Sequence, residues 1–361
     1  MNYINGEYLN IHYGDILIKF QTIKNCDDGD LPYINKDVDV SKKNSLLIDG
    51  DVVMADTAED YAAGKAIEVF NVKAQKIISG LHTIPLRPKI KFYSGYLGYY
   101  LNSRSFKDQI HPLIQGIKVY SISKTALSST YISFPDVQEQ AKIAILVKSI
   151  DEKICVQNKI IEDLLLVRKG IIESFFSVST NSASLSIYLK ERKTYSEKGE
   201  GYEHVTLSKE GICPKTDRYD RDFLVKSEDK NYKITKLNDI CYNPANLKFR
   251  VICLNDYGNA IFSPIYVTFE VKNIDPYYLS LYLTSESFIK HILRYQQGTV
   301  YERMSVGPED FCKGKIPIKN SFEIENFIKG IRLLDKKIKL EKSVLNDFNI
   351  QKNYLLNNLF I

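Results

Sequence analysis

Two stretches of the chain have the residue types of a metal-dependent nuclease. Residues 135–136 read PD and residues 151–153 read DEK, which fits the PD-(D/E)xK pattern. That chemistry requires two carboxylates to converge on one cation from neighbouring strands. Residues 151–153, however, fall in a long heptad pattern typical of a helix, and a second copy of the region reads PI at 317–318. We therefore interpret the match as accidental.

Two proline loops suggest a different chemistry. Residues 243–246 read NPAN and residues 263–266 read SPIY, and both resemble the (N/D/S)PP(Y/F) loop of amino-methyltransferases. Both lack the second proline that shapes that loop, and no glycine-rich loop for S-adenosylmethionine follows a first strand. The chain also has no Walker A sequence, which argues against a nucleotide-driven motor.

The cysteines and histidines have no spacing typical of a metal site. The six cysteines never form a C-x-x-C pair, which argues against a zinc ribbon, a redox motif and a disulfide framework. The five histidines are scattered and are more typical of structural positions. We expect no catalytic residue, no metal ligand and no cofactor bound by this chain.

Composition bounds the class of protein. The chain has 361 residues, of which 44% are hydrophobic and 26% charged, and this predicts two or three globular domains. No apolar run reaches the roughly 18 residues of a membrane-spanning helix, and we expect a cytoplasmic protein without a membrane partner. The formal net charge is only +5. If nucleic acid is a partner, folding must cluster the positive charge or another subunit must supply it.

The chain contains an internal duplication. Residues 96–106 read YLGYYLNSRSF and residues 278–288 read YLSLYLTSESF, an offset of 182. The same offset aligns Gln115-Gly116 with Gln297-Gly298 and Pro135 with Pro317, after which the offset becomes 184. Further matches are Asp151 with Asp335, Phe176 with Phe360 and, upstream, Gly50-Asp51-Val52 with Asn238-Asp239-Ile240. Each half is therefore a mixed globular region followed by a long helix.

The two long helices carry a heptad pattern. Apolar residues alternate in steps of four and three, interrupted at Gln157, Arg168, Glu341 and Lys352. Such a pattern predicts that the helices pair, and opposite charge at Arg168 and Glu341 suits an antiparallel pair. The alternative is that each helix packs only on its own domain. The residues expected at the helix pairing are Ile143, Val147, Ile150, Ile154, Ile161, Leu164, Ile171, Phe175, Phe327, Ile331, Leu334, Ile338, Leu345, Phe348, Leu355 and Leu359.

The globular regions have the sequence pattern of an α+β fold. Residues 45–70 and 203–275 combine apolar alternation with turn residues, which predicts short strands, and residues 94–110 and 276–293 are amphipathic. We expect two mixed globular domains, each followed by a long helix of an antiparallel coiled coil. The expected boundaries are 1–135 and 180–318 for the globular domains, and 136–179 and 319–361 for the helices.

The ordered set resembles the specificity subunit of type I restriction-modification systems. YEHVTLSKEGI…YKITKLNDICYNPANLKFRVICLNDYGNAIFSPIYVTFEV is similar to the second target-recognition domain of that family. IHYGDILIKF…LLIDGDVVMADTAEDYAAGKA is similar to one lineage of its first domain, and FPDVQEQAKIAILVKSIDEKI and IKNSFEIENFIKGIRLLDKKI to its conserved spacers. Family members usually have a lead-in before the first strand that contains Gly-Asp. Gly14-Asp15 comes almost at once here, so the first domain is expected to be N-terminally short.

The resemblance implies a role without catalysis. Each recognition domain would read one half of a split double-stranded DNA target, and the helix pair would set the distance between the halves. Two adenine methyltransferase subunits would dock on it, and motor-endonuclease subunits would join. S-adenosylmethionine, ATP and Mg would sit on those partners only. The alternatives are a protein-only coiled-coil scaffold, an inactive truncated or recombined specificity allele, and a subunit with its own methyltransferase site.

The residues expected to contact DNA are basic or aromatic. The best candidates follow the repeated Gln-Gly, because arginine can read a guanine edge through two hydrogen bonds and lysine can do so or hold a phosphate. These are Lys118 and Arg303, with Tyr301 in the same loop. The weaker candidates are Lys65, Lys124, Lys215, Arg218, Arg221, Lys248 and Arg250. A solvated surface charge is the alternative interpretation for each of the basic residues.

Overall fold

The computed structural model describes residues 1–35, 40, 46–177, 181–196, 201–209, 211–215, 231–298 and 304–360. Within them, the chain divides into two compact units, Met1–Ile160 with Glu341–Ile361, and Ile161–Leu340. We call these unit 1 and unit 2. Each unit contains one globular head and a part of both long helices, α5 (Val137–Ser177) and α9 (Ser321–Asn358). The domain boundaries expected from the sequence stay a prediction.

The head of unit 1 is built around a four-stranded sheet with the strand order β2-β5-β3-β7. Strands β2 and β5 are parallel, and the other two pairings are antiparallel. Two further pairs, β1 with β6 and β4 with β8, flank it. The elements are β1 (Leu9–Ile11), α1 (Tyr13–Ile18), β2 (Ile23–Asn25), η1 (Cys26–Asp28), β3 (Val52–Ala55), β4 (Thr57–Ala58), β5 (Ala66–Phe70), β6 (Ile77–Ser79), β7 (Thr83–Leu86), α2 (Tyr96–Tyr100), α3 (Arg104–Ile110), η2 (His111–Leu113), β8 (Tyr120–Ser121) and α4 (Lys124–Leu127).

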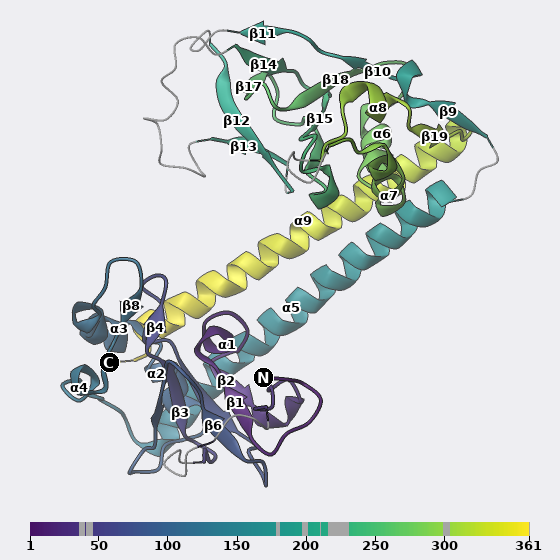
Figure 1. The fold of residues 1–361 in the computed structure, drawn as a ribbon. Coiled ribbons are helices and arrows are strands. Elements are labelled where there is room, and N and C mark those ends of the chain that lie inside the picture. The colour runs from purple at the N-terminus through teal and green to yellow at the C-terminus, as the bar shows by residue number, and fades with distance from the viewer. Residues whose placement is uncertain are drawn as a thin grey trace. The chain divides into compact units, whose positions relative to one another are not determined.

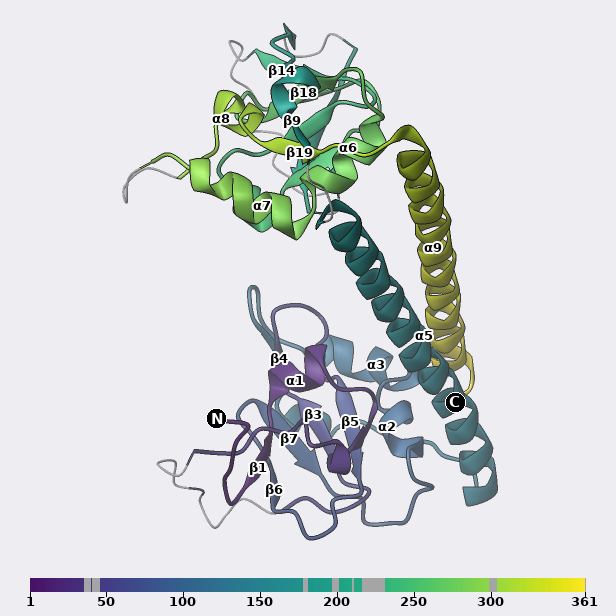
Figure 2. The same cartoon turned by 90° about the vertical axis from the view of Figure 1, so that its right-hand side faces the viewer.

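Strand β3 is buried on both faces, which explains its unbroken apolar run. Val52 and Met54 point into a cluster that includes α2 and α5, whereas Val53 and Ala55 point into a second cluster with α1. Successive side chains of a strand point to opposite faces, so a strand covered on both sides must be apolar throughout. Figure 2 shows α2 between this sheet and α5.

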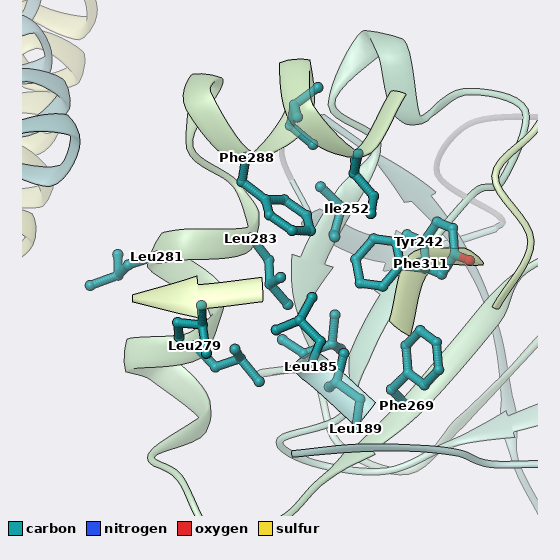
Figure 3. Close-up of a cluster of buried hydrophobic side chains, with 14 of the residues drawn as sticks. Leu185, Leu189, Tyr242, Ile252, Phe269, Leu279, Leu281, Leu283, Phe288 and Phe311 are labelled. Carbon is teal, nitrogen blue, oxygen red and sulfur yellow. The ribbon is translucent and has the colours of Figure 1, made fainter. Parts of the chain in front are cut away.

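The head of unit 2 contains two larger sheets, with strand orders β10-β18-β15-β16 and β11-β14-β17-β12-β13. Its main core lies between the first sheet and the helices, where Tyr242, Phe269 and Phe311 stack on one another (Figure 3). The elements are β9 (Ser182–Ser184), η3 (Leu185–Ile187), β10 (Leu189–Glu191), β11 (Tyr195–Ser196), β12 (Glu203–Ser208), β13 (Gly211–Pro214), β14 (Tyr232–Thr235), β15 (Ile240–Tyr242), η5 (Leu247–Phe249), β16 (Ile252–Leu254), β17 (Ala260–Phe262), β18 (Val267–Val271), α6 (Pro276–Leu283), α7 (Glu286–Ile292), η6 (Leu293–Tyr295), α8 (Pro308–Cys312) and β19 (Lys315–Pro317).

The duplicated sequence forms duplicated local structure. The two matching amphipathic segments each form two short helices, α2–α3 and α6–α7. Ser103 and Ser285 cap the second helix of each pair by accepting a hydrogen bond from the backbone N–H of Phe106 and Phe288. A serine hydroxyl at the N-cap satisfies a backbone donor that the first helical turn leaves without a partner.

The last phenylalanine of each repeat packs on a head in the same way. In unit 1, the ring of Phe360 packs on Tyr96 and Tyr100, with centroid distances of 5.5 and 6.0 Å. In unit 2, the matching Phe176 packs on Tyr278 and Tyr282 at 5.4 and 4.9 Å. Because Phe360 ends the second repeat, the first head is completed by the helix of the other repeat.

Helices α5 and α9 pack antiparallel in both units. In unit 1, Lys352 binds Asp151 at 2.6 Å, and the side-chain amide of Gln157 donates to the carbonyl of Glu341 at 3.0 Å. In unit 2, Arg168 binds Asp335 at 2.5 Å. Residue numbers rise along one helix while they fall along the other. The expected α+β fold with a long antiparallel helix pair is confirmed.

The pairing partner expected for Arg168 was wrong. Arg168 binds Asp335, and Glu341 instead accepts the hydrogen bonds of Gln157. The register therefore places each polar interruption of one helix beside a polar residue of the other. Asp151 and Asp335 also accept a hydrogen bond from a head tyrosine, Tyr99 at 2.9 Å and Tyr277 at 2.6 Å.

Fifteen of the sixteen residues expected at the helix pairing are buried or half-buried. The exception is Ile171, which is 44% exposed, while its neighbour Ile172 is buried in the head of unit 2. An α-helix drifts by about 20° per heptad relative to a strict seven-residue repeat, so the inward face moves by one residue along a long helix.

Gly14-Asp15 and Gly50-Asp51 of the first head lie in different kinds of structure. Gly14-Asp15 lies in α1 rather than in a strand, and the side chain of His12 caps that helix. The Gly-Asp that directly precedes a strand is Gly50-Asp51, before β3.

Among the described residues, no helix is long and apolar enough to cross a membrane.

Candidate nucleic-acid interface

Each head presents a closed loop directly after its helix pair. In unit 1 the loop runs from Gln115 to Ser121, whose backbones exchange two hydrogen bonds of 2.9 and 2.8 Å. Gly116 has φ of +137°, and a Cβ there would lie 1.9 Å from the carbonyl oxygen of Val119. Only glycine fits this position, which explains the repeated Gln-Gly.

The second copy has the same closure with a longer loop. Gln297 and Ser305 exchange two backbone hydrogen bonds of 2.9 Å, and Gly298 has φ of +145°. The side chain of Gln297 also donates to Asp310 at 2.8 Å. The closure spans two more residues than in unit 1.

The tip of the unit 1 loop is apolar and exposed. Ile117 is 92% exposed, Val119 is also exposed, and Lys118 between them is exposed as well. Single exposed apolar side chains are common on protein surfaces, but here two of them lie on either side of a lysine at the tip of a closed loop. The tip therefore combines a cation with groups that can contact a thymine methyl.

An aromatic pair lies at the base of this loop. The rings of Tyr61 and Tyr120 are 4.6 Å apart, and Tyr61 is 64% exposed. The pKa of Tyr120 is raised, chiefly by its hydrogen bond to Tyr61 and then by the charge of that residue. The ring centroid of His111 lies 6.3 Å from that of Tyr61. Tyr61 and Ile117 were not among the contacts expected from the sequence. For Ile117 the available signal was its place between Gly116 of the repeated Gln-Gly and Lys118.

A buried aspartate paired with an arginine supports a central strand of each head. In unit 1, Arg87 makes two hydrogen bonds to Asp51, at 2.8 and 2.6 Å. In unit 2, Arg192 makes two to Asp239, at 2.7 and 2.8 Å. Each carboxylate also accepts the backbone N–H three residues earlier, and the preceding Gly50 or Asn238 has a positive φ. These hydrogen bonds raise the pKa of both guanidinium groups.

The structure separates the predicted DNA contacts into accessible and engaged groups. Lys118, Lys124 and Lys248 are exposed. Lys118 and Lys124 lie on either side of β8, and Lys248 lies in η5 with its ammonium 4.9 Å from the ring of Phe249. Lys215 is half-buried at the end of β13.

Lys65 and Arg250 are engaged within the fold. The ammonium of Lys65 donates to the carbonyl of Leu17 at 2.9 Å, and its pKa is lowered first by burial and then by Lys352 and Lys107. Arg250 binds Glu286 at 3.1 Å.

Glu286 is surrounded by three cations. Besides Arg250, it binds Lys169 at 2.6 Å and Lys290 at 2.9 Å. These hydrogen bonds, with Lys169 first, lower the pKa of Glu286 to about 2. A phosphate at Arg250 would therefore have to compete with this carboxylate.

Four of the predicted contacts lie outside the described residues. They are Arg218, Arg221, Tyr301 and Arg303. In the part of the chain that the structure describes, no group of three or more histidine, cysteine or acidic residues could hold a metal ion.

The comparisons with known proteins point to one family. The model of the type I restriction modification DNA specificity domain matches residues 2–166. A curated relative, the putative type I restriction enzyme MjaX specificity subunit of Methanocaldococcus jannaschii, is 31% identical over 146 residues. This alignment covers 39% of the present chain and 33% of the relative, so it spans about a third of that protein's length.

Solved structures share the fold over most of the chain. The S subunit of a type I restriction-modification system from M. genitalium aligns with a TM-score of 0.50 and 15% identity, over 99% of this chain and 89% of its own. A chain from a structure of the assembly and conformational transition of a type I R-M system aligns with a TM-score of 0.56 and 12% identity, over 89% and 84%. At these identities the likeness shows the fold alone.

Each unit thus combines a mixed α+β head and an antiparallel pair of helix segments. Residues 2–166 match the model of the type I restriction modification DNA specificity domain, and the resemblance inferred from the sequence is confirmed.

Proposed function

We propose that this chain is the non-catalytic, cytoplasmic DNA specificity subunit of a type I restriction-modification system, and that it reads a split DNA target. The observation that carries this proposal is the duplication of the head together with its closed loop, at Gln115–Ser121 and at Gln297–Ser305. Two equivalent reading elements on one chain suit a target with two half-sites. The match of residues 2–166 to the DNA specificity domain supports the same role.

In this proposal the loops read bases. Lys118 contacts a guanine edge or a phosphate, and Ile117 contacts the methyl group of a thymine. Arg303 has the matching place in the second loop. Lys124 and Lys248 hold phosphates, which orient the head without reading the sequence.

The helix pair sets the distance between half-sites. Two readers joined by stiff helices accept only half-sites at one separation, as dimeric DNA readers do. The chain recruits two adenine methyltransferase subunits, and motor-endonuclease subunits join for restriction. S-adenosylmethionine, ATP and Mg bind to those partners, whose basic surfaces also supply most phosphate contacts, in keeping with the small net charge of +5.

Co-expression with the methyltransferase subunit of the same system, followed by long-read mapping of modified adenines, tests the proposal. We expect methylation at one split motif with a fixed gap. Arg303→Ala should relax or weaken the sequence requirement at one half-site, and Lys118→Ala at the other. A stable complex without any methylation would indicate an inactive specificity allele, and no complex at all would favour a protein-only scaffold.

A further inference from the structure

Each head carries an exposed aromatic residue at the same repeat position. In unit 1, Tyr61 follows the buried Asp51 by ten residues and is 64% exposed. In unit 2, Phe249 follows the buried Asp239 by ten residues and is 51% exposed. Single exposed aromatic residues are common on protein surfaces. Here the two lie at matching positions, after the matching strands β3 and β15, although the residues around them differ, and this indicates a shared use.

The same hydrogen bond joins both aromatic segments to the closed loops. In unit 1, the backbone N–H of Ile122, directly after the closed loop, donates to the carbonyl of Asp56 at 2.8 Å. In unit 2, the backbone N–H of Val306, directly after the closed loop, donates to the carbonyl of Pro244 at 3.2 Å. Each acceptor lies five residues before the exposed aromatic residue of its head. The two aromatic positions are therefore equivalent in the folded heads as well as in the sequence.

The unit 1 segment holds its ring beside the closed loop. The carboxylate of Asp60 accepts a hydrogen bond from the backbone N–H of Ala62 at 2.9 Å, and Ala63 is buried. The ring of Tyr61 lies 4.6 Å from that of Tyr120, which belongs to the closed loop. The ring thus has a fixed place while most of its surface faces solvent.

The unit 2 segment is a rigid turn. The side-chain oxygen of Asn243 accepts hydrogen bonds from the backbone N–H groups of Ala245 and Asn246, at 3.1 and 3.3 Å. Leu247 is completely buried, and the backbone N–H of Phe249 donates to the carbonyl of Asn246 at 2.9 Å. The NPAN segment, which resembles a methyltransferase loop in sequence, is thus a turn that presents Phe249.

Basic residues lie on both sides of the unit 2 ring. Lys248 is exposed, and its ammonium lies 4.9 Å from the ring of Phe249. Arg250 follows the ring and binds Glu286 at 3.1 Å, so its charge is shared with a carboxylate. A ring with an exposed lysine beside it suits the edge of a DNA groove, where the ring meets the bases and the cation meets a phosphate.

Acidic residues precede the unit 1 ring. Glu59 and Asp60 are both exposed and directly precede Tyr61. Carboxylates repel phosphates but accept a hydrogen bond from the amino group of cytosine. Tyr61 is therefore suited to meet the bases, and the exposed Lys118 of the adjoining closed loop supplies the positive charge of this region.

We propose that Tyr61 and Phe249 each insert at a base step of one half-site, next to the bases that the closed loop reads, and open that step. This inference rests on the proposed function, in which each head binds one half of a split DNA target. Side chains inserted in this way unstack a base step and kink the duplex. Stacking on a base tolerates a change of aromatic residue, because every base has a π-face, so tyrosine and phenylalanine serve equally.

Fluorescence of 2-aminopurine in a duplex with the split motif, bound by the full chain with its methyltransferase subunit, tests the inference. The label replaces adenines of the motif and of the adjoining steps, but not the methylated adenine, because methyltransferases flip their target base. We expect unstacking to raise the fluorescence at one step in each half-site. Tyr61→Ala should abolish the rise in one half-site and Phe249→Ala in the other. Each should weaken DNA binding roughly 5- to 100-fold, as loss of base–aromatic stacking does.

Matched variants separate the ring from other causes. Tyr61→Phe and Phe249→Tyr keep the ring and should keep the fluorescence rise. Tyr131→Ala and Tyr195→Ala remove exposed tyrosines outside these two segments and should leave both half-sites unchanged. Circular dichroism shows whether each variant folds. Adenine mapping of Tyr61→Ala should give the native motif, since the closed loop stays in place.

Three results would contradict these expectations. Unchanged fluorescence and DNA binding in the folded alanine variants would overturn the inference and leave the proposed function intact. An altered motif in Tyr61→Ala would also overturn it, because the ring would then serve only to hold the closed loop. Absence of a split methylation motif with the native chain would overturn the proposed function and the inference with it.

Discussion

The buried aspartate of each head is paired with an arginine, but the exposure of the arginine differs, and this predicts unequal costs for the same substitution. Asp51 and Asp239 are almost completely buried. The side chain of Arg192, the partner of Asp239, is 14% exposed, whereas that of Arg87, the partner of Asp51, is 50% exposed. When the carboxylate is removed, Arg87 can reach water and Arg192 remains largely buried.

The expected magnitudes follow from this difference. Asp239→Ala leaves a buried charge without its partner, and we expect a loss of about 3–5 kcal/mol in the free energy of unfolding. Asp51→Ala removes hydrogen bonds to an exposed guanidinium and to one backbone N–H, and we expect a loss of about 1–3 kcal/mol. Combining Asp239→Ala with Arg192→Met should recover part of the loss, because the uncompensated charge is removed.

Hydrogen exchange measures the two heads separately. Amide protection of peptides covering β3 and β15, followed with urea unfolding, reports the local and global stability of each variant. We expect β15 to lose more protection in Asp239→Ala than β3 loses in Asp51→Ala. Equal losses, or a larger loss for Asp51→Ala, would refute the argument that arginine exposure decides the cost.

Three further predictions concern single groups. In Gly116→Ala the positive φ alone costs about 1–3 kcal/mol, and the added Cβ would lie 1.9 Å from the carbonyl oxygen of Val119, so the loop must change shape. Adenine mapping should then show a relaxed sequence requirement at one half-site, with the other unchanged. Lys352→Ala leaves the buried Asp151 without its ion pair and should cost roughly 3 kcal/mol in urea unfolding, whereas the exposed Lys142→Ala should cost less than about 0.5 kcal/mol. Burial raises the pKa of Glu68 above its ordinary value of 4.5, so its contribution to stability is full below that pH and declines as the pH rises through the folded pKa. The native chain should therefore lose stability relative to Glu68→Gln as the pH rises above 4.5, and a constant difference would contradict this.

The sequence pattern predicted features that depend on local spacing. The heptads predicted the long helices, because the apolar face of a helix repeats every three to four residues. The repeat aligned Ser103 with Ser285 without assigning a role to either, and both form the same N-cap, since capping involves only residues three apart. The repeated Gln-Gly marked the closed loops, because the positive φ of Gly116 and Gly298 requires glycine at that position.

Contacts between distant elements could not be predicted in the same way. Pairing Arg168 with Glu341 was wrong, because the partner of a polar residue depends on the register between two helices and not on their separate patterns. Lys65 and Lys118 look alike in sequence, yet Lys65 binds a backbone carbonyl of α1 and Lys118 is exposed at a loop tip.

The duplication, the α+β class and the two long helices could be predicted from the sequence, because periodicity and local turns depend on residues that are close together in the chain. The packing of Phe360 on the first head and the pairing of Asp51 and Asp239 with different arginines could be found only from the folded structure. These features arise where surfaces far apart in the chain meet, and their geometry depends on packing that no local spacing specifies.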